Sequence, residues 1–246
     1  MKIFITGGSR GIGASIVTTS LKQGHEVAFT YNNPDTDIEA ILHKFRKTAP
    51  DALCKAYQLD VRDSDKVAEV VDQVVDDFDT IDAVVNNAGI VVAGLTASMS
   101  DEDWQSVIDT NLTGAFYVVR QFLPLFLANK KGRFVMMSSV ASAGIPGHVS
   151  YNVSKAGLVS LSNTIALEYG SKGITSNAIL PGVFSGGMTY SSGHMVDTIM
   201  KSRLELCAMK RLGKLEELAE LVLFLASDKA EFVNGEAINI AGGLMK

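Results

Sequence analysis

The stretch Thr6-Gly7-Gly8-Ser9-Arg10-Gly11-Ile12-Gly13 decides the fold of this chain. It follows an apolar run at Ile3–Thr6 that predicts a buried strand, and it opens a helical pattern that reaches Gln23. Glycine permits a sharp turn and lets a pyrophosphate approach main-chain N–H groups, and the helix start adds unpaired N–H donors and the positive end of its dipole. The spacing therefore predicts a nucleotide-phosphate site. For such a motif taken alone, a plain strand–helix turn with extra glycines is the alternative.

Predicted strands and helices alternate along the chain. Strands are expected at Ile3–Thr6, Glu26–Tyr31, Leu53–Leu59, Ile81–Val85, Arg133–Met137, Ile174–Leu180 and Glu236–Ile240. Helices are expected at Gly11–Gln23, Ile38–Lys47, Asp63–Phe78, Asp101–Ala128, Ser150–Tyr169 and Leu215–Ala226, with an irregularity at Pro124. This alternation predicts an α/β fold: a single-domain, Rossmann-type doubly wound parallel sheet with helices on both faces, spanning residues 1–246. The Gly-, Ser- and Met-rich stretch Val183–Met195 breaks the rhythm, and a loop this long is typical of a lid, a binding loop or a disordered segment. We expect a substrate lid over residues 183–207.

Composition excludes several classes of protein. The chain has 246 residues, 47% of them apolar and 20% charged, which is too apolar and too weakly charged for disorder. The formal charge of −5 offers no basic surface for nucleic acid. Two distant cysteines favour a reducing, cytoplasmic compartment, and no apolar run approaches the roughly 18 residues of a membrane span. The four histidines form no metal-ligand spacing, so we expect no metal.

The end of the second predicted strand indicates which dinucleotide would bind. NAD sites often place an acid about 20 residues beyond the glycines, where it contacts the adenosine ribose. Here the strand ends at Tyr31 and Asn32, and the acids Asp35 and Asp37 come only later. A neutral strand end does not repel a 2′-phosphate, and Arg10 could contact one. The sequence therefore favours NADP over NAD.

Tyr151 and Lys155 form the strongest candidate for chemistry. Their spacing of four places both side chains on one face of the predicted helix. A free phenol has a pKa near 10, and a neighbouring ammonium lowers it by favouring the phenolate. The pair therefore predicts an acid/base unit for reducing a carbonyl or oxidising an alcohol. Without further context, the alternative is an ordinary pair on an amphipathic helix.

Several motifs occur together and in order along the chain. They are Thr6-Gly7-x3-Gly11-x-Gly13, Leu59-Asp60-Val61, Asn86-Asn87-Ala88-Gly89, Asn111, Ser138-Ser139, Tyr151-x3-Lys155 and Pro181-Gly182. In this combination, from residue 2 to residue 243, the chain resembles the short-chain dehydrogenase/reductase family. Within that family it is most similar to the bacterial 3-oxoacyl-acyl-carrier-protein reductases.

The resemblance implies a role for each of these residues. Tyr151 would protonate the substrate oxygen, Lys155 would lower the tyrosine pKa and bind the nicotinamide ribose, and Asn111 would hold a water that links Lys155 to solvent. A serine would hold the carbonyl oxygen. Asp60 and Val61 would meet the adenine. The full expected NADP(H) site comprises Gly7, Ser9, Arg10, Gly11, Ile12, Gly13, Tyr31, Asn32, Asp60, Val61, Asn87, Ala88, Gly89, Tyr151, Lys155, Pro181, Gly182 and Val183.

Two departures from the family pattern leave residues open. Counting back from Tyr151 identifies Ser138 as the catalytic serine, whereas counting forward from the preceding strand identifies Ser139. We favour Ser139, because strand register is harder to shift than loop length. The family's threonine after Pro181-Gly182 is replaced by Gly186, with Ser185 and Thr189 as substitutes for its contact with the nicotinamide carboxamide.

The resemblance also suggests partners. Acyl carrier proteins are acidic, so a reductase that acts on them needs basic residues near its cleft, and Lys130, Lys131 and Lys172 match such positions. Ordinary surface lysines are the alternative. The family forms dimers or tetramers through its long helices, here around Leu112–Leu127 and Gly157–Leu167.

Three functions remain open at this point. The first is NADPH-dependent reduction of a 3-oxoacyl thioester in fatty-acid or polyketide-like biosynthesis. The second is a dehydrogenase for a free small alcohol or ketone, a sugar or a steroid, because the family uses one catalytic group for all of these. The third is a non-catalytic NADP-binding subunit.

Overall fold

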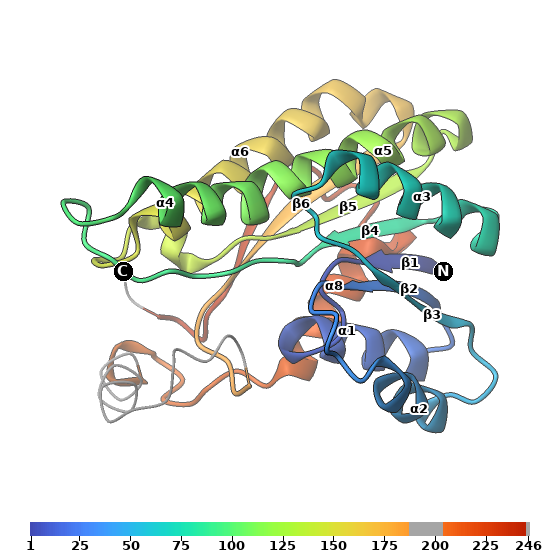
Figure 1. Ribbon diagram of the computed structural model, residues 1–246, viewed down its shortest axis with the longest axis horizontal. Helices are drawn as coiled ribbons and strands as arrows, with labels where there is room; N and C mark the ends of the chain where they lie inside the picture. Colours follow the sequence, from blue (N-terminus) through green and yellow to red (C-terminus); the bar gives the residue numbers. More distant parts are fainter. Residues whose placement is uncertain (187–203, 245–246) are drawn as a thin grey trace.

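Seven parallel strands form one twisted sheet in the order β3-β2-β1-β4-β5-β6-β7 (Figure 1). The computed structural model describes residues 1–186 and 204–244. The strands are β1 (Lys2–Ile5), β2 (Glu26–Tyr31), β3 (Cys54–Gln58), β4 (Ala83–Asn86), β5 (Gly132–Met137), β6 (Ile174–Pro181) and β7 (Ala237–Ile240). Because all the pairings are parallel, the carboxyl ends of the strands meet at one edge of the sheet. The predicted α/β fold is confirmed.

Helices cover both faces of the sheet (Figure 1). One face carries α3, α5 and α6, and the other carries α1, α2 and α8. The helices are α1 (Gly11–Lys22), α2 (Ile38–Thr48), α3 (Ser64–Phe78), α4 (Asp101–Ile108), α5 (Gly114–Asn129), α6 (Val149–Tyr169) and α8 (Leu215–Ala226). None of the helices in the described part of the chain is long and apolar enough to cross a lipid bilayer.

The two helical layers enclose two separate cores. Alternate residues of β1 point to opposite faces, so Phe4 packs with α5 while Ile3 and Ile5 pack with α1 and α8. On the α5 face, Phe4 lies 4.9 Å from Phe122 between ring centres, and further rings continue the stack toward β5. Burial on both faces explains why central strands such as β1 and β4 are nearly continuous apolar runs.

The predicted helix at 101–128, with its expected irregularity at Pro124, differs from the structure in two respects. A π-helical turn, Asp109–Thr113, separates α4 from α5. The turn places Asn111 inward, fully buried, where its carboxamide pairs with the main chain of Ile90. Pro124 does not interrupt α5, which continues to Asn129, and the helix keeps Phe122 and Phe126 packed in the core on either side of the proline.

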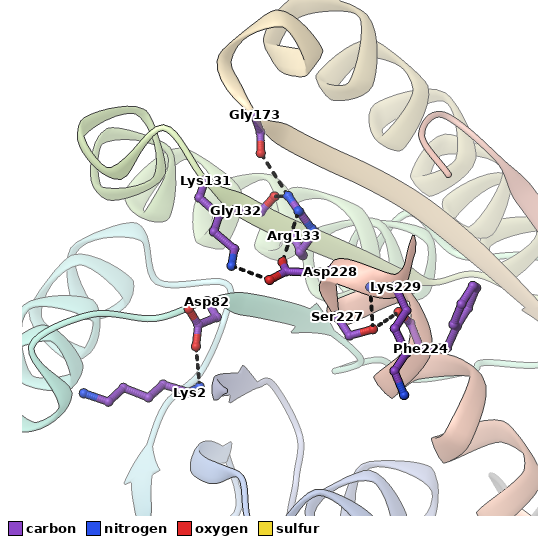
Figure 2. Close-up of polar contacts among 10 residues, drawn as sticks. All are labelled: Lys2, Asp82, Lys131, Gly132, Arg133, Gly173, Phe224, Ser227, Asp228 and Lys229. Atoms are coloured by element: carbon purple, nitrogen blue, oxygen red, sulfur yellow. Dashed lines mark hydrogen bonds and ion pairs between the residues drawn. The ribbon is translucent and has the colours of Figure 1, made fainter. Parts of the chain in front are cut away.

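At the amino ends of the strands, a buried arginine joins three segments (Figure 2). The Arg133 guanidinium donates to the carbonyl oxygens of Gly132 and Gly173, at 3.1 and 2.9 Å, and lies 3.4 Å from the Asp228 carboxylate. The Lys131 ammonium reaches the same carboxylate at 2.8 Å. This cluster ties the loops before β5 and β6 to the segment that follows α8.

The expected lid lies largely outside the described residues. Of residues 183–207, the structure describes Val183–Gly186 and Leu204–Cys207. Phe184 pairs with Gly213, and Cys207 pairs with Leu244, in isolated bridges beside the carboxyl end of β6. The lid therefore stays a prediction.

Candidate active site

A large cleft of about 1130 Å³ opens at the carboxyl ends of the strands. This is the edge where ligands bind in open parallel sheets. Every residue predicted to contact the dinucleotide lines the cleft, from the glycine turn to the loop after β6, and both candidate serines do as well. Asn111 is the predicted site residue that does not line it, because its side chain lies beneath the cleft floor.

The glycine turn has the shape that a pyrophosphate needs. Gly7 adopts a φ of 67°, and a Cβ on Gly13 would lie 2.1 Å from the Gly7 oxygen, so the helix packs against the turn only because Gly13 has no side chain. Helix α1 has no acid in its first turn, which leaves its N–H groups and dipole available to an anion. These observations fit a dinucleotide phosphate at the start of α1.

The loop after β4 braces the glycine turn. The Asn87 amide donates to the carbonyl oxygens of Thr6 and Gly7 at 2.9 and 3.1 Å. In return, the Thr6 hydroxyl accepts the main-chain N–H groups of Asn87 and Ala88, both at 2.9 Å. The turn and the loop therefore form one rigid wall of the cleft.

Two charged residues, Arg10 and Asp60, also line the cleft. Arg10 is the residue before α1; it is exposed and forms no ion pair with any residue of 1–186 or 204–244. Asp60 accepts hydrogen bonds of 2.6 to 3.0 Å from the Arg62 guanidinium. Arg62 holds the pKa of the Asp60 carboxyl below its usual value, and Asn32 adds to this effect. The carboxylate is therefore fixed in place and ionised.

Tyr151 and Lys155 meet inside the cleft, as their spacing predicts. The Lys155 ammonium lies 5.6 Å from the centre of the Tyr151 ring and donates to the Met137 carbonyl oxygen at 2.7 Å. The lysine is almost wholly buried, and burial lowers its pKa to about 8. A positive charge at this position favours the ionised form of the neighbouring phenol.

The two candidate serines have different partners. Ser138 is buried, and its hydroxyl donates to the Lys155 carbonyl oxygen at 2.7 Å. Ser139 is half-buried, and its hydroxyl accepts the Ala141 N–H at 3.1 Å at the start of a 3₁₀ turn. Within the described residues the Ser139 hydroxyl donates to no acceptor, so its proton remains available to a ligand in the cleft.

Asn111 and Ser154 form a buried hydrogen-bonded pair next to Tyr151 and Lys155. The Asn111 carboxamide accepts from the Ile90 N–H at 2.8 Å and donates to the Ile90 oxygen at 2.9 Å and to the Ser154 hydroxyl at 3.0 Å. Sequence reasoning missed Ser154. The available signal was its place three residues after Tyr151, on the buried side of the same helix.

Four apolar side chains line the cleft and pack in one cluster with Tyr151: Ile90, Val91, Ala141 and Ile145. Val140 and Leu212 add apolar surface elsewhere in the cleft. An apolar substrate chain would be buried well in these surroundings.

The loop after β6 completes the cleft at Ser185 and Gly186, the chain's departure from the family threonine. Gly186 adopts a φ of 78°, and its carbonyl oxygen would lie 3.4 Å from a Cβ on Gly11. The loop thus approaches the glycine turn across the cleft. Thr189, the other candidate substitute, lies outside the described residues.

The three lysines expected near the cleft lie elsewhere in a single chain. Lys130 and Lys131 precede β5, and Lys172 precedes β6, so all three are at the amino ends of the strands, opposite the cleft. The Lys131 ammonium is already paired with Asp228 (Figure 2). The predicted strands at Arg133–Met137 and Ile174–Leu180 already carried the signal for this placement, because residues directly before a strand of a parallel sheet lie at the edge opposite the ligand cleft.

Known proteins resemble this chain over nearly its full length. A profile of the family described as Enoyl-(Acyl carrier protein) reductase matches residues 7–245. A 3-oxoacyl-(acyl carrier protein) reductase FabG of Staphylococcus epidermidis is 36% identical over 241 residues, covering 98% of this chain and 97% of that protein. A 3-oxoacyl-(acyl carrier protein) reductase of Synechocystis sp. is 35% identical over 243 residues, covering 98% and 95%. The crystal structure of a Sinorhizobium meliloti 1021 protein assigned as a short-chain alcohol dehydrogenase has a TM-score of 0.91 and 31% identity, covering 99% of this chain and 95% of that one.

Proposed function

Because this chain belongs to the short-chain dehydrogenase/reductase family, whose members are nicotinamide-dependent oxidoreductases acting on CH–OH or C=O groups, we propose that it reduces a 3-oxoacyl thioester. The substrate would be carried by an acyl carrier protein, the product would be the 3-hydroxyacyl thioester, and NADPH would be the reductant in fatty-acid or polyketide-like biosynthesis. The observation that carries the proposal is the buried Lys155 ammonium beside the Tyr151 ring, in a cleft continuous with the glycine turn.

Each site residue has a chemical role in this proposal. When bound, the reduced dinucleotide supplies the hydride that adds to the substrate carbonyl carbon. Tyr151 gives its phenolic proton to the carbonyl oxygen, which becomes the hydroxyl oxygen of the product. Ser139 donates a hydrogen bond to that oxygen as negative charge develops on it. Lys155 stabilises the resulting phenolate and binds the nicotinamide ribose, while Asn111 supports Lys155 from below.

The choice of NADPH over NADH rests on charge. Tyr31 and Asn32 bring no carboxylate to the end of β2, and the Arg10 guanidinium, which lines the cleft, forms no ion pair within residues 1–186 and 204–244. A 2′-phosphate placed there would gain a charge-assisted hydrogen bond without repulsion. The remaining contacts fall to Asp60 and Val61 at the adenine and to Pro181-Gly182-Val183 at the nicotinamide.

The relatives and the apolar lining support an acyl substrate. The curated relatives are named for reducing 3-oxoacyl groups on a carrier protein. The apolar side chains near Tyr151 suit an acyl chain better than a sugar. Turnover of acetoacetyl thioesters, both on a carrier protein and on a small pantetheine mimic, would be compared with turnover of free ketones. Faster turnover of the thioesters supports the proposal, and exclusive turnover of free ketones supports a dehydrogenase for small free substrates.

Carrier docking at the lysines requires a second copy of the chain. Lys130, Lys131 and Lys172 are at the edge opposite the cleft, so a carrier bound there would serve the cleft of a neighbouring subunit. Large apolar side chains are exposed on α5 and α6, including Leu167 at 80%, and they support a dimer or tetramer through these helices. Charge reversal at Lys172 should raise KM for the carrier-bound substrate more than for the pantetheine mimic, and equal effects would argue against docking there.

A further inference from the structure

Lys155 is buried, and its ammonium has no carboxylate partner in the part of the chain that the structure describes. No ion pair reaches it within residues 1–186 and 204–244, and burial is the cause of its lowered pKa. The groups that face it are the Tyr151 ring from α6, the Met137 carbonyl from β5 and the loop at Gly89. A buried ammonium of this kind depends on nearby dipoles, because bulk water cannot stabilise it.

Asn111 supplies one such dipole across Gly89. A Cβ built on Gly89 would lie 3.1 Å from the Asn111 carboxamide oxygen and 3.5 Å from the Lys155 nitrogen. The oxygen and the ammonium therefore approach the same point beside Gly89. Ile90 fixes which way the carboxamide faces, because its N–H pairs with the oxygen and its carbonyl pairs with the amide nitrogen.

Ser154 fixes where that carboxamide lies relative to α6. Its hydroxyl accepts from the Asn111 amide at 3.0 Å and donates to the Tyr151 carbonyl oxygen at 2.8 Å. A serine that bonds only to its own helix is common, but this one also bridges to the π-helical turn and has no solvent exposure. One hydroxyl thus connects the segment that carries Asn111 to the helical turn that carries Tyr151 and Lys155.

We propose that Ser154 is a positioning residue, whose hydroxyl couples the Asn111 carboxamide to the first turns of α6 and keeps the carboxamide oxygen beside the Lys155 ammonium. This inference rests on the function proposed above for Tyr151 and Lys155. Without the bridge, the two segments lose their common hydrogen bond and the dipole no longer supports the charge as well.

The test measures Lys155 directly, without substrate. The protein labelled with ¹³C at the lysine ε-carbons would be titrated by NMR, with Lys155→Met identifying the Lys155 signal. Ser154→Ala should lower the titration midpoint of Lys155 by about half a pH unit, since a single buried hydrogen bond is lost. Ser154→Thr, which keeps the hydroxyl, should restore the midpoint toward that of the unmodified protein.

Ser162→Ala is the matched control. Ser162 is another buried serine on α6, bonded at 2.9 Å to the Ser176 hydroxyl and remote from Asn111, so its loss should leave the midpoint unchanged. In turnover assays, Ser154→Ala should lower kcat several-fold and move its alkaline limb to lower pH, with little change in the KM for NADPH. An unchanged Lys155 midpoint in Ser154→Ala would overturn the inference. If no carbonyl is turned over by the unmodified protein but the midpoint still moves, the proposed function fails and the Ser154 coupling stands.

Discussion

The Lys155 ammonium lies 5.6 Å from the centre of the Tyr151 ring, within the cleft that also contains the glycine turn. Helical spacing places the two side chains on one face, and packing of α6 against β5 buries the lysine against the Met137 carbonyl. A phenol beside a buried positive charge is suited to giving up its proton.

Arg10→Leu should weaken the binding of NADPH but not that of NADH. The substitution removes the charged group available to a 2′-phosphate, so KM for NADPH should rise about tenfold while KM for NADH stays nearly constant. Steady-state kinetics with both cofactors measure this. Lys44→Leu removes an exposed charge that does not line the cleft and serves as the control. An unaltered preference for NADPH in Arg10→Leu would remove Arg10 from cofactor selection.

Alanine substitutions should distinguish the roles of Ser138 and Ser139. Ser139→Ala removes the donor to the substrate oxygen and should lower kcat by about 10²-fold. Ser138→Ala removes a buried bond to the Lys155 carbonyl, so it should cost about 1 kcal/mol of unfolding free energy and lower kcat by less than tenfold. Parallel assays of activity and urea unfolding distinguish them. The reverse ranking of kcat would make Ser138 the catalytic serine.

Arg62→Ala should make cofactor binding sensitive to acid. Arg62 holds the pKa of Asp60 below its usual value, so losing the guanidinium raises that pKa and the carboxylate protonates sooner as pH falls. An ordinary Asp carboxyl titrates near pH 4, so binding of NADPH, followed by fluorescence, should weaken more between about pH 5.5 and pH 4 in the variant than in the unmodified protein. Reduced nicotinamide mononucleotide, which lacks the adenosine, should show no such difference. Equal pH dependence for both ligands would contradict a role for Asp60 at the adenine.

Lys155→Met should stabilise the cofactor-free protein near neutral pH. Burial lowers the pKa of Lys155 in the folded protein to about 8, from the usual 10.5. Folding therefore costs free energy at any pH where the lysine of the unfolded chain is protonated, and this cost reaches its full size below pH 8. The shift corresponds to about 3 kcal/mol, reduced by the lost bond to Met137. In urea unfolding, the variant should have a larger free energy of unfolding than the unmodified protein at pH 7, and the difference should be smaller at pH 9.5. Lys172→Met, at an exposed lysine, should give no such pH-dependent gain. If the variant were no more stable than the unmodified protein at pH 7, the cost assigned to burying the Lys155 ammonium would be contradicted.

The fold was predictable because it is encoded in local periodicity. Apolar runs such as Ile3–Thr6 and the helical pattern of Ser150–Tyr169 each identify an element, and the alternation of strands and helices determines the layers. The position of the glycine turn between the first strand and the first helix then places the cleft. These signals need no knowledge of distant contacts.

Other features depend on contacts between distant segments. The π-helical turn at Asp109–Thr113 accompanies the pairing of Asn111 with Ile90, and no local pattern encodes that pairing. The sequence alone did not decide between Ser138 and Ser139, because the two are adjacent at the end of a strand and differ only in the direction in which their side chains point. The lysines at 130, 131 and 172 matched family positions, but their place directly before β5 and β6 in the parallel sheet puts them at the edge opposite the cleft.

Tyr151→Phe tests the central claim most directly. The change keeps the ring and its packing but removes the proton that Tyr151 is proposed to donate. Single-turnover reduction of an acetoacetyl thioester should slow by about 10² to 10⁴-fold, with NADPH affinity measured by fluorescence nearly unchanged. Turnover close to that of the unmodified protein, with the cofactor still bound, would contradict Tyr151 as the proton donor.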